Sequence, residues 1–272
     1  MAGSAKLTKL PDGHAAAAQP LAAQAIVTDS RGLLAGEVSI ATTDGELLAY
    51  RAMPDGQGPF ALILVVQEIF GVHEHIRDVC RRLARLGYLA VAPDLYARQG
   101  DPSRLDSVER ILEDIVARVP SAQVMADLDA VVAWGVASGL ADPERLAVTG
   151  FCWGGRVVWL YAAHNPRLKA GVAWYGRLDG SRSALQPLQP LDVAARLQVP
   201  ILGLYGERDA GIPLDSVQRM REALEKSTAE TRIVVYSGAP HGFFADYRAS
   251  YQPETAALAW REMLDWLRQH GV

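Results

Sequence analysis

Short apolar runs alternate with longer amphipathic segments along most of this chain. Phe60–Val66 is the clearest run; it follows Gly58-Pro59 and has the pattern of a strand buried on both faces. Further runs of this kind are Tyr88–Ala92, Leu146–Thr149, Ala170–Tyr175, Ile201–Tyr205 and Ile233–Tyr236. Segments with helical periodicity separate them, namely Ile76–Leu86, Val124–Ala137, Val157–Ala163, Ser216–Leu224 and Thr255–Arg268. This alternation predicts an α/β fold with a mostly parallel central sheet and helices on both faces.

An antiparallel hairpin is predicted ahead of the first buried run. Glu37–Thr42 and Leu47–Ala52 flank the turn signal Thr43-Asp44-Gly45-Glu46. These two strands belong at the edge of the sheet and bring it to about eight strands. We therefore expect residues 36–272 to form a single domain.

Residues 1–35 are expected to form an extension outside the core. Its alanine-rich part ends in Ala23-Gln24-Ala25, which resembles a signal-peptide cleavage site, but Pro11, Asp12 and His14 interrupt the region before it. We therefore expect no working secretory signal and a cytoplasmic protein. A periplasmic location is the alternative, if the extension replaces an export signal.

Composition narrows the classes of partner. The 272 residues are 50% hydrophobic, enough for one large core, and the net charge of −4 offers no basic excess for nucleic acid. A membrane span is not expected because no run reaches about 18 apolar residues. Cys80 and Cys152 are too few for a disulfide framework, although one bridge between them stays open. We expect a monomer or small homo-oligomer.

The chemistry is concentrated in the motif Gly150-Phe151-Cys152-Trp153-Gly154-Gly155. It lies between a predicted strand and a predicted helix, as the nucleophile elbow of α/β-hydrolases does, with cysteine in the place of serine. Glycines two residues before and after the nucleophile fit this tight turn, where side chains would collide with the backbone. The motif predicts a covalent hydrolase of the α/β-hydrolase fold.

A base and an acid follow two of the buried runs. Asp209 comes after Ile201–Tyr205, and His241 comes after the last run, so both should meet Cys152 beyond the carboxyl ends of the strands. The order nucleophile, acid, histidine is that of α/β-hydrolases. His241 would accept the thiol proton and later activate water, while Asp209 would hold its tautomer. Glu207 and Asp215 are the alternative acids.

No metal or cofactor is expected. His73-Glu74-His75 has a metal-like composition, but histidines two positions apart do not share a helix face. We expect this segment to begin a helix and to line the entrance of the pocket.

Two further blocks carry a family resemblance. Val66-Gln67-Glu68-Ile69-Phe70-Gly71-Val72 and Ala92-Pro93-Asp94-Leu95-Tyr96-Ala97-Arg98-Gln99 precede the cysteine elbow, and Gly238-Ala239-Pro240-His241-Gly242-Phe243 follows it. In this order, from about residue 36 to the C-terminus, the chain resembles the dienelactone hydrolases (carboxymethylenebutenolidases). The resemblance implies hydrolysis of a small lactone or ester, without a cofactor.

The resemblance also implies roles for individual residues. It gives a catalytic triad of Cys152, His241 and Asp209. It further implies that Glu68 helps to ionise the thiol and that Arg98 receives a substrate carboxylate. From the residues themselves, free backbone amides at a strand end and at a helix N-terminus suggest an oxyanion hole made by Ile69 and Trp153.

The chain departs from the family at one position. The family has a second substrate-binding arginine four residues after the histidine, where this chain has Ala245; Arg248 is the candidate replacement. The other expected substrate-binding residues are Tyr96, Trp174 and Tyr175. If Arg248 does not take this role, a neutral ester substrate is favoured.

Two alternative functions stay open. A broad carboxylesterase would hydrolyse neutral esters as well as anionic lactones and would not depend on Arg98. A non-catalytic hydrolase-fold protein would bind a small molecule or a partner, and its Cys152 would react with iodoacetamide like an ordinary thiol.

Overall fold

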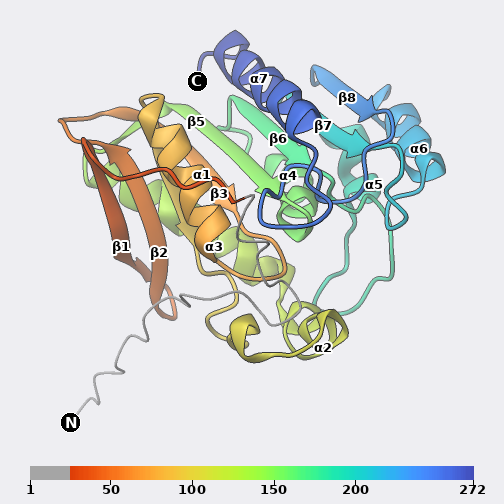
Figure 1. Cartoon of the computed structure of the whole chain (residues 1–272), viewed down its shortest axis with the longest axis horizontal. Coiled ribbons are helices and arrows are strands. Elements are labelled where there is room, and N and C mark those ends of the chain that lie inside the picture. The colour runs from red at the N-terminus through yellow and green to blue at the C-terminus, as the bar shows by residue number, and fades with distance from the viewer. Residues whose placement is uncertain (1–24) are drawn as a thin grey trace.

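An eight-stranded sheet forms the centre of the computed structural model, which describes residues 25–272 (Figure 1). The strand order is β1-β2-β4-β3-β5-β6-β7-β8; β2 is antiparallel to β1 and β4, and the remaining pairs are parallel. The strands are β1 (Leu33–Thr42), β2 (Gly45–Pro54), β3 (Phe60–Val66), β4 (Leu89–Pro93), β5 (Ala141–Phe151), β6 (Ala170–Trp174), β7 (Ile201–Gly206) and β8 (Thr231–Tyr236). The predicted α/β-hydrolase fold is confirmed.

Helices cover both faces of the sheet. In Figure 1, α1 and α7 lie in front of the strands and α3 and α4 lie behind them, so β3, β4, β6 and β7 are almost entirely buried. The α-helices are α1 (Glu74–Arg85), α2 (Val108–Asp114), α3 (Ser121–Ala137), α4 (Trp153–His164), α5 (Pro190–Val193), α6 (Leu214–Leu224) and α7 (Pro253–Gln269). Short 3₁₀ helices are η2 (Pro102–Arg104), η3 (Val116–Arg118) and η4 (Ala194–Arg196). Within residues 25–272, no helix has both the length and the apolar character needed to cross a membrane.

The start of the described chain is attached to α1. The Thr28 amide donates to Asp78 Oδ1 (2.5 Å), and Arg81 Nε donates to the Thr28 carbonyl (2.7 Å). The domain boundary predicted at residue 35 falls inside β1, because Leu33 already pairs with Pro54 of β2. Most of the predicted extension, including the first two residues of Ala23-Gln24-Ala25, lies outside the described residues.

The predicted helices and strands are present, whereas α5, η4 and a longer segment were not predicted. The longer segment comprises η2, α2 and η3. Its residues are mostly partly or fully exposed, and α2 begins with a Ser107 cap that accepts from the Arg110 amide. A short helix with few buried positions leaves no clear hydrophobic period in the sequence.

Close packing of α4 on β3 makes the elbow glycines necessary. A Cβ atom at Gly154 would lie 2.4 Å from the Val66 carbonyl oxygen and 2.6 Å from that of Gln67, distances that require the backbone to move. Parallel strands place their carboxyl ends at one edge of the sheet, so this contact fixes Cys152 beside the loop that follows β3.

We expect Gly154→Ala to lower the free energy of unfolding by about 3 kcal/mol, because the new methyl group overpacks the junction between helix and strand. Urea denaturation followed by circular dichroism measures this loss. Gly36→Ala is the matched control, since a Cβ there meets nothing within 4 Å. Equal stability of the two variants would contradict the packing described here.

Candidate active site

Cys152 lies in a strained turn between β5 and α4. Its backbone has φ 55° and ψ −114°, a conformation that residues with a side chain rarely adopt. The Cys152 amide donates to the Trp174 carbonyl (3.0 Å), which holds the turn against β6. This is the strand, turn and helix arrangement expected of a nucleophile elbow, and it presents the thiol at the N-terminus of α4.

His241 and Asp209 form a hydrogen-bonded pair on the loops after β8 and β7. His241 Nδ1 lies 2.6 Å from Asp209 Oδ2, and the Asp209 side chain is fully buried. The same carboxylate accepts from the Gly211 amide at 2.9 Å, which fixes its orientation. The imidazole is thereby held with Nε2 available for chemistry.

The two alternative acids point elsewhere. Glu207 accepts from Ser237 Oγ (2.9 Å) and from the Gly238 amide (2.7 Å). Asp215 pairs with Arg219 one helical turn later, on an exposed face of α6. Of the three predicted carboxylates, Asp209 is the one that contacts His241.

The charge of His241 depends on its neighbours. Burial lowers the pKa of His241, but negative charge on the adjacent Cys152 sulfur and the hydrogen-bonded Asp209 carboxylate raise it to about 10. His241 is therefore an imidazolium at neutral pH when Cys152 is a thiolate. A thiolate beside an imidazolium is the reactive form of a cysteine nucleophile.

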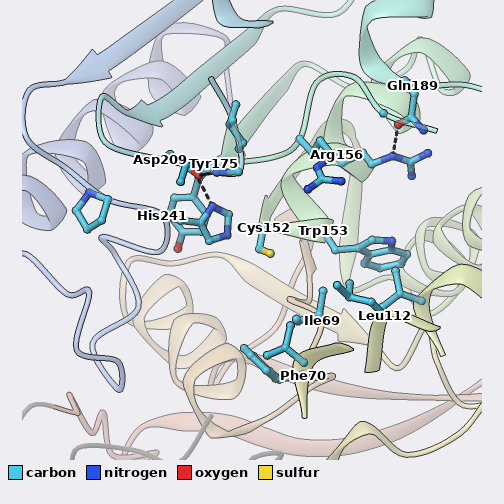
Figure 2. Close-up of a pocket in the computed structure, with 18 of the residues that line it drawn as sticks. Ile69, Phe70, Leu112, Cys152, Trp153, Arg156, Tyr175, Gln189, Asp209 and His241 are labelled. Carbon is cyan, nitrogen blue, oxygen red and sulfur yellow. Dashed lines mark hydrogen bonds and ion pairs between the residues drawn. The ribbon is translucent and has the colours of Figure 1, made fainter. Parts of the chain in front are cut away.

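Cys152, His241 and Asp209 all line one cavity of about 580 Å³, a size typical of small-molecule sites (Figure 2). Apolar side chains from α2 and η3 and from the loop after β3 line part of the cavity. The charged lining residues are mainly cationic: Asp209 is the one carboxylate among the described lining residues, which include Arg156, Arg177, Arg208 and Arg248.

Ile69 and Trp153 also line the cavity, near Cys152 in Figure 2. Trp153 is the first residue of α4, so its amide has no partner within the helix. Ile69 follows β3 on the adjacent loop. Their role as the donors of an oxyanion hole stays a prediction.

Glu68 lies behind the cavity lining. Its carboxylate accepts from Tyr247 Oη (2.6 Å) and lies 3.2 Å from His73 Nε2. Burial raises the pKa of Glu68, but the His73 and Tyr247 contacts outweigh burial and lower it to about 2. The carboxylate is therefore held ionised, and its second oxygen, Oε1, is buried without a hydrogen-bond partner among the described residues.

Arg98 is not at the cavity. Its guanidinium makes two bonds to Asp127 (2.8 and 3.0 Å) and one to Asp44 (2.7 Å). These bonds tie the loop after β4 to α3 and to the β1–β2 turn. The predicted role of Arg98 in binding a substrate carboxylate stays a prediction, and it requires the guanidinium to leave these partners.

Two of the predicted aromatic residues pack beneath the site and do not line the cavity. Tyr96 is fully buried with its ring 4.9 Å from that of Trp153. Trp174 is also fully buried, and its Nε1 donates to Thr149 Oγ1 (3.1 Å). Both residues support the site from the core, and their predicted contact with substrate stays a prediction.

Tyr175 and Arg248 do line the cavity. The Tyr175 ring meets the His241 ring edge to face, with centroids 5.1 Å apart. Arg248 lies over the Phe70 ring at 5.6 Å. That Arg248 replaces the family arginine stays a prediction.

The segment His73-Glu74-His75 does not reach the entrance, which corrects our expectation. Both histidines are buried, and His75 Nδ1 lies 3.2 Å from Asp246 Oδ1. Packing of α1 against the loop that holds Asp246 turns these rings inward. Among residues 25–272, no group of three or more His, Cys, Asp and Glu side chains is placed to hold a metal ion.

Sequence reasoning did not single out Arg156, Arg177, Arg208 or the apolar residues of α2 as part of the site. Arg156 had a usable signal, because it lies one helical turn after Cys152 at the start of α4. The others lie on loops whose direction no sequence period reveals.

Comparisons with known proteins place the chain in a family. The sequence model of the dienelactone hydrolase family matches residues 47–271. A Methylorubrum extorquens protein named "Putative carboxymethylenebutenolidase" is 59% identical over 266 residues, covering 97% of this chain and 91% of that protein. A crystal structure of a "Putative Dienelactone Hydrolase" from Klebsiella pneumoniae is 54% identical with a TM-score of 0.85, covering 87% of this chain and 99% of that one.

A more distant relative has a more specific name. A Bradyrhizobium protein named "Probable 2-oxo-3-(5-oxofuran-2-ylidene)propanoate lactonase" is 31% identical over 234 residues, covering 86% of this chain and 93% of that protein. Both the family model and the relatives span most of the described domain. The chain belongs to the dienelactone hydrolase family and is a hydrolase that acts on ester or lactone bonds.

Proposed function

We propose that the protein hydrolyses a small lactone or carboxylic ester through an acyl-cysteine intermediate on Cys152. The observation that carries the proposal is the thiol on a strained elbow, in the same cavity as the hydrogen-bonded pair of His241 and Asp209. Nucleophile, base and orienting acid thus meet at one wall.

The reaction has two halves. The Cys152 thiolate attacks the carbonyl carbon, and the amides of Ile69 and Trp153 stabilise the negative charge on the carbonyl oxygen. The bond to the leaving oxygen breaks, and that oxygen takes a proton from His241. Water then gives its proton to His241 and attacks the thioester, which releases the acid and restores the thiolate.

The lining favours an anionic substrate over a neutral one. Four arginines face a cavity in which Asp209 is the one carboxylate among the described lining residues, and Asp209 already pairs with His241. An anion is therefore attracted and a cation repelled. The relative named as a lactonase of a propanoate supports the same class, whereas the broad esterase remains the second candidate.

For Glu68 we propose a supporting role in the resting enzyme. It is adjacent in sequence to Ile69, and its bonds to His73 and Tyr247 fix the loop after β3 that carries the oxyanion amide. Transfer of the thiol proton to Glu68, as the family resemblance implies, requires its side chain to leave these two partners when substrate binds.

The proposal is tested by trapping the intermediate. A 4-nitrophenyl ester is mixed with the enzyme and quenched in acid within the first turnovers, and peptides are analysed by mass spectrometry. We expect the acyl group on the peptide that contains Cys152, and we expect prior alkylation by iodoacetamide to stop turnover. Continued turnover by fully alkylated enzyme would refute the covalent mechanism.

A further inference from the structure

Arg156 is a buried cation in the cavity wall that the proposed mechanism does not use. It lies one turn after Cys152 on α4, is 7% exposed, and lines the cavity together with Cys152. Figure 2 shows its side chain running toward Gln189, on the side of Cys152 away from His241. The guanidinium is therefore separated from the catalytic pair by the nucleophile.

Neutral groups hold Arg156 in place. Its Nε donates to Gln189 Oε1 (2.7 Å), and its Nη2 donates to the Leu188 carbonyl (2.8 Å). Gln189 is itself fixed by a bond from its Nε2 to the Ser181 carbonyl (2.6 Å). No carboxylate among residues 25–272 pairs with this guanidinium, and Nη1 donates to no acceptor there.

Arginines on other elements have carboxylate partners. Arg81 and Arg82 both contact Asp78, and Arg98 contacts Asp127. Burial without such a partner lowers the pKa of Arg156 to about 10. Because an unpaired buried charge is costly, a cation kept in this state points to a partner that arrives with the ligand.

The walls beside Arg156 are apolar. Trp153 follows the nucleophile, and Val108, Leu112 and Val116 come from α2 and its flanks. Gln186, which also lines the cavity, donates to the Val116 and Val119 carbonyls (2.7 and 3.1 Å) and so ties this segment to the loop before Gln189. The cavity therefore offers an apolar surface next to one fixed cation.

We propose that Arg156 binds an anionic group of the substrate. The preferred ester or lactone then carries a carboxylate, which lies on the opposite side of the scissile carbonyl from His241. Its apolar part packs against Trp153 and Leu112. A guanidinium held by Gln189 and Leu188 keeps one edge for this carboxylate. Arg156 is thus a specificity-determining residue. The inference rests on the proposed function, because it locates the anion relative to Cys152.

Matched ester pairs test the role of Arg156. The first pair is 4-nitrophenyl pentanoate and the 4-nitrophenyl monoester of glutaric acid, in which a carboxylate replaces the terminal methyl group. The second pair, methyl 4-acetoxybenzoate and 4-acetoxybenzoate, places the charge on the leaving group. Steady-state kcat and KM are measured for wild type, Arg156→Met, Arg156→Lys, Arg248→Met and the exposed control Arg196→Met, with melting temperatures alongside.

For at least one pair, we expect wild type to favour the anionic ester, and Arg156→Met to lower kcat/KM for that ester by roughly 30-fold or more, mainly through KM. The neutral ester should change by less than about threefold. Arg156→Lys should restore part of the preference, and Arg196→Met should behave as wild type.

Three outcomes would overturn the role of Arg156. They are an equal loss on neutral and anionic esters, an undiminished anionic preference in Arg156→Met, and a preference that disappears in Arg248→Met but survives in Arg156→Met. The first indicates that Arg156 only fixes the Gln189 loop. Failure of the cysteine mechanism is separate, because it would appear as neutral-ester turnover by Cys152→Ala.

Discussion

Replacing Cys152 with alanine is expected to lower kcat/KM for ester hydrolysis by at least about 10⁴-fold. The thiol is the one nucleophile that the elbow presents beside His241, and alanine leaves the water reaction with only the oxyanion donors to assist it. Steady-state hydrolysis of a 4-nitrophenyl ester measures the effect, provided that the detection limit lies well below the turnover rate expected for the variant. Turnover within tenfold of wild type would contradict covalent catalysis.

Cys80→Ala is the matched control for this substitution. Cys80 is the only other cysteine of the chain and lies fully buried in α1, on a face that does not line the cavity. It should retain wild-type kcat/KM and lose a little stability through the missing sulfur. Calorimetry that measures the binding of a product carboxylate to Cys152→Ala shows whether the cavity is intact when activity is lost.

Replacing His241 with glutamine is expected to lower kcat/KM by roughly 10³-fold or more. Glutamine keeps a polar side chain near Asp209 but cannot accept the proton of water, so deacylation stops. It also removes the imidazole, whose pKa is raised to about 10 beside Cys152 and Asp209. Iodoacetamide should therefore alkylate Cys152 more slowly in the variant at neutral pH.

His164→Gln is the control for the loss of a histidine. His164 lies at the exposed end of α4, where its Nε2 is 2.7 Å from Asp129, and it does not line the cavity. We expect unchanged turnover and unchanged alkylation in this variant. If His241→Gln kept wild-type alkylation and turnover, the pairing of His241 with Cys152 would be wrong.

The ion pairs of Arg98 bear on where the substrate is expected to lie. With Arg98 bound to Asp127 and Asp44, the cations that remain at the cavity are those on α4 and on the loops after β6, β7 and β8. The strands β6, β7 and β8 lie at the end of the sheet away from the β1–β2 hairpin. A carboxylated substrate is therefore expected to extend from Cys152 toward Arg156 and the α2 segment.

The sequence by itself determined the sheet, the elbow and the chain order of Cys152, Asp209 and His241. These features depend on local rules: apolar runs mark buried strands, small residues mark the tight turn, and reactive side chains gather after the strand ends. The contact between His241 and Asp209 follows from that order once the sheet is parallel.

Only the tertiary structure decided which charged side chains face the cavity. Arg98 and Asp127 are 29 positions apart, and Arg98 and Asp44 are 54 apart, so no local pattern shows that these residues meet. The sequence does not show which of Arg98 and Arg156 has a carboxylate partner. In the structure, the guanidinium of Arg156 contacts neutral acceptors from a distant loop. The direction of a long cationic side chain is set by which carboxylates the fold brings within reach, and that depends on the packing of the whole domain.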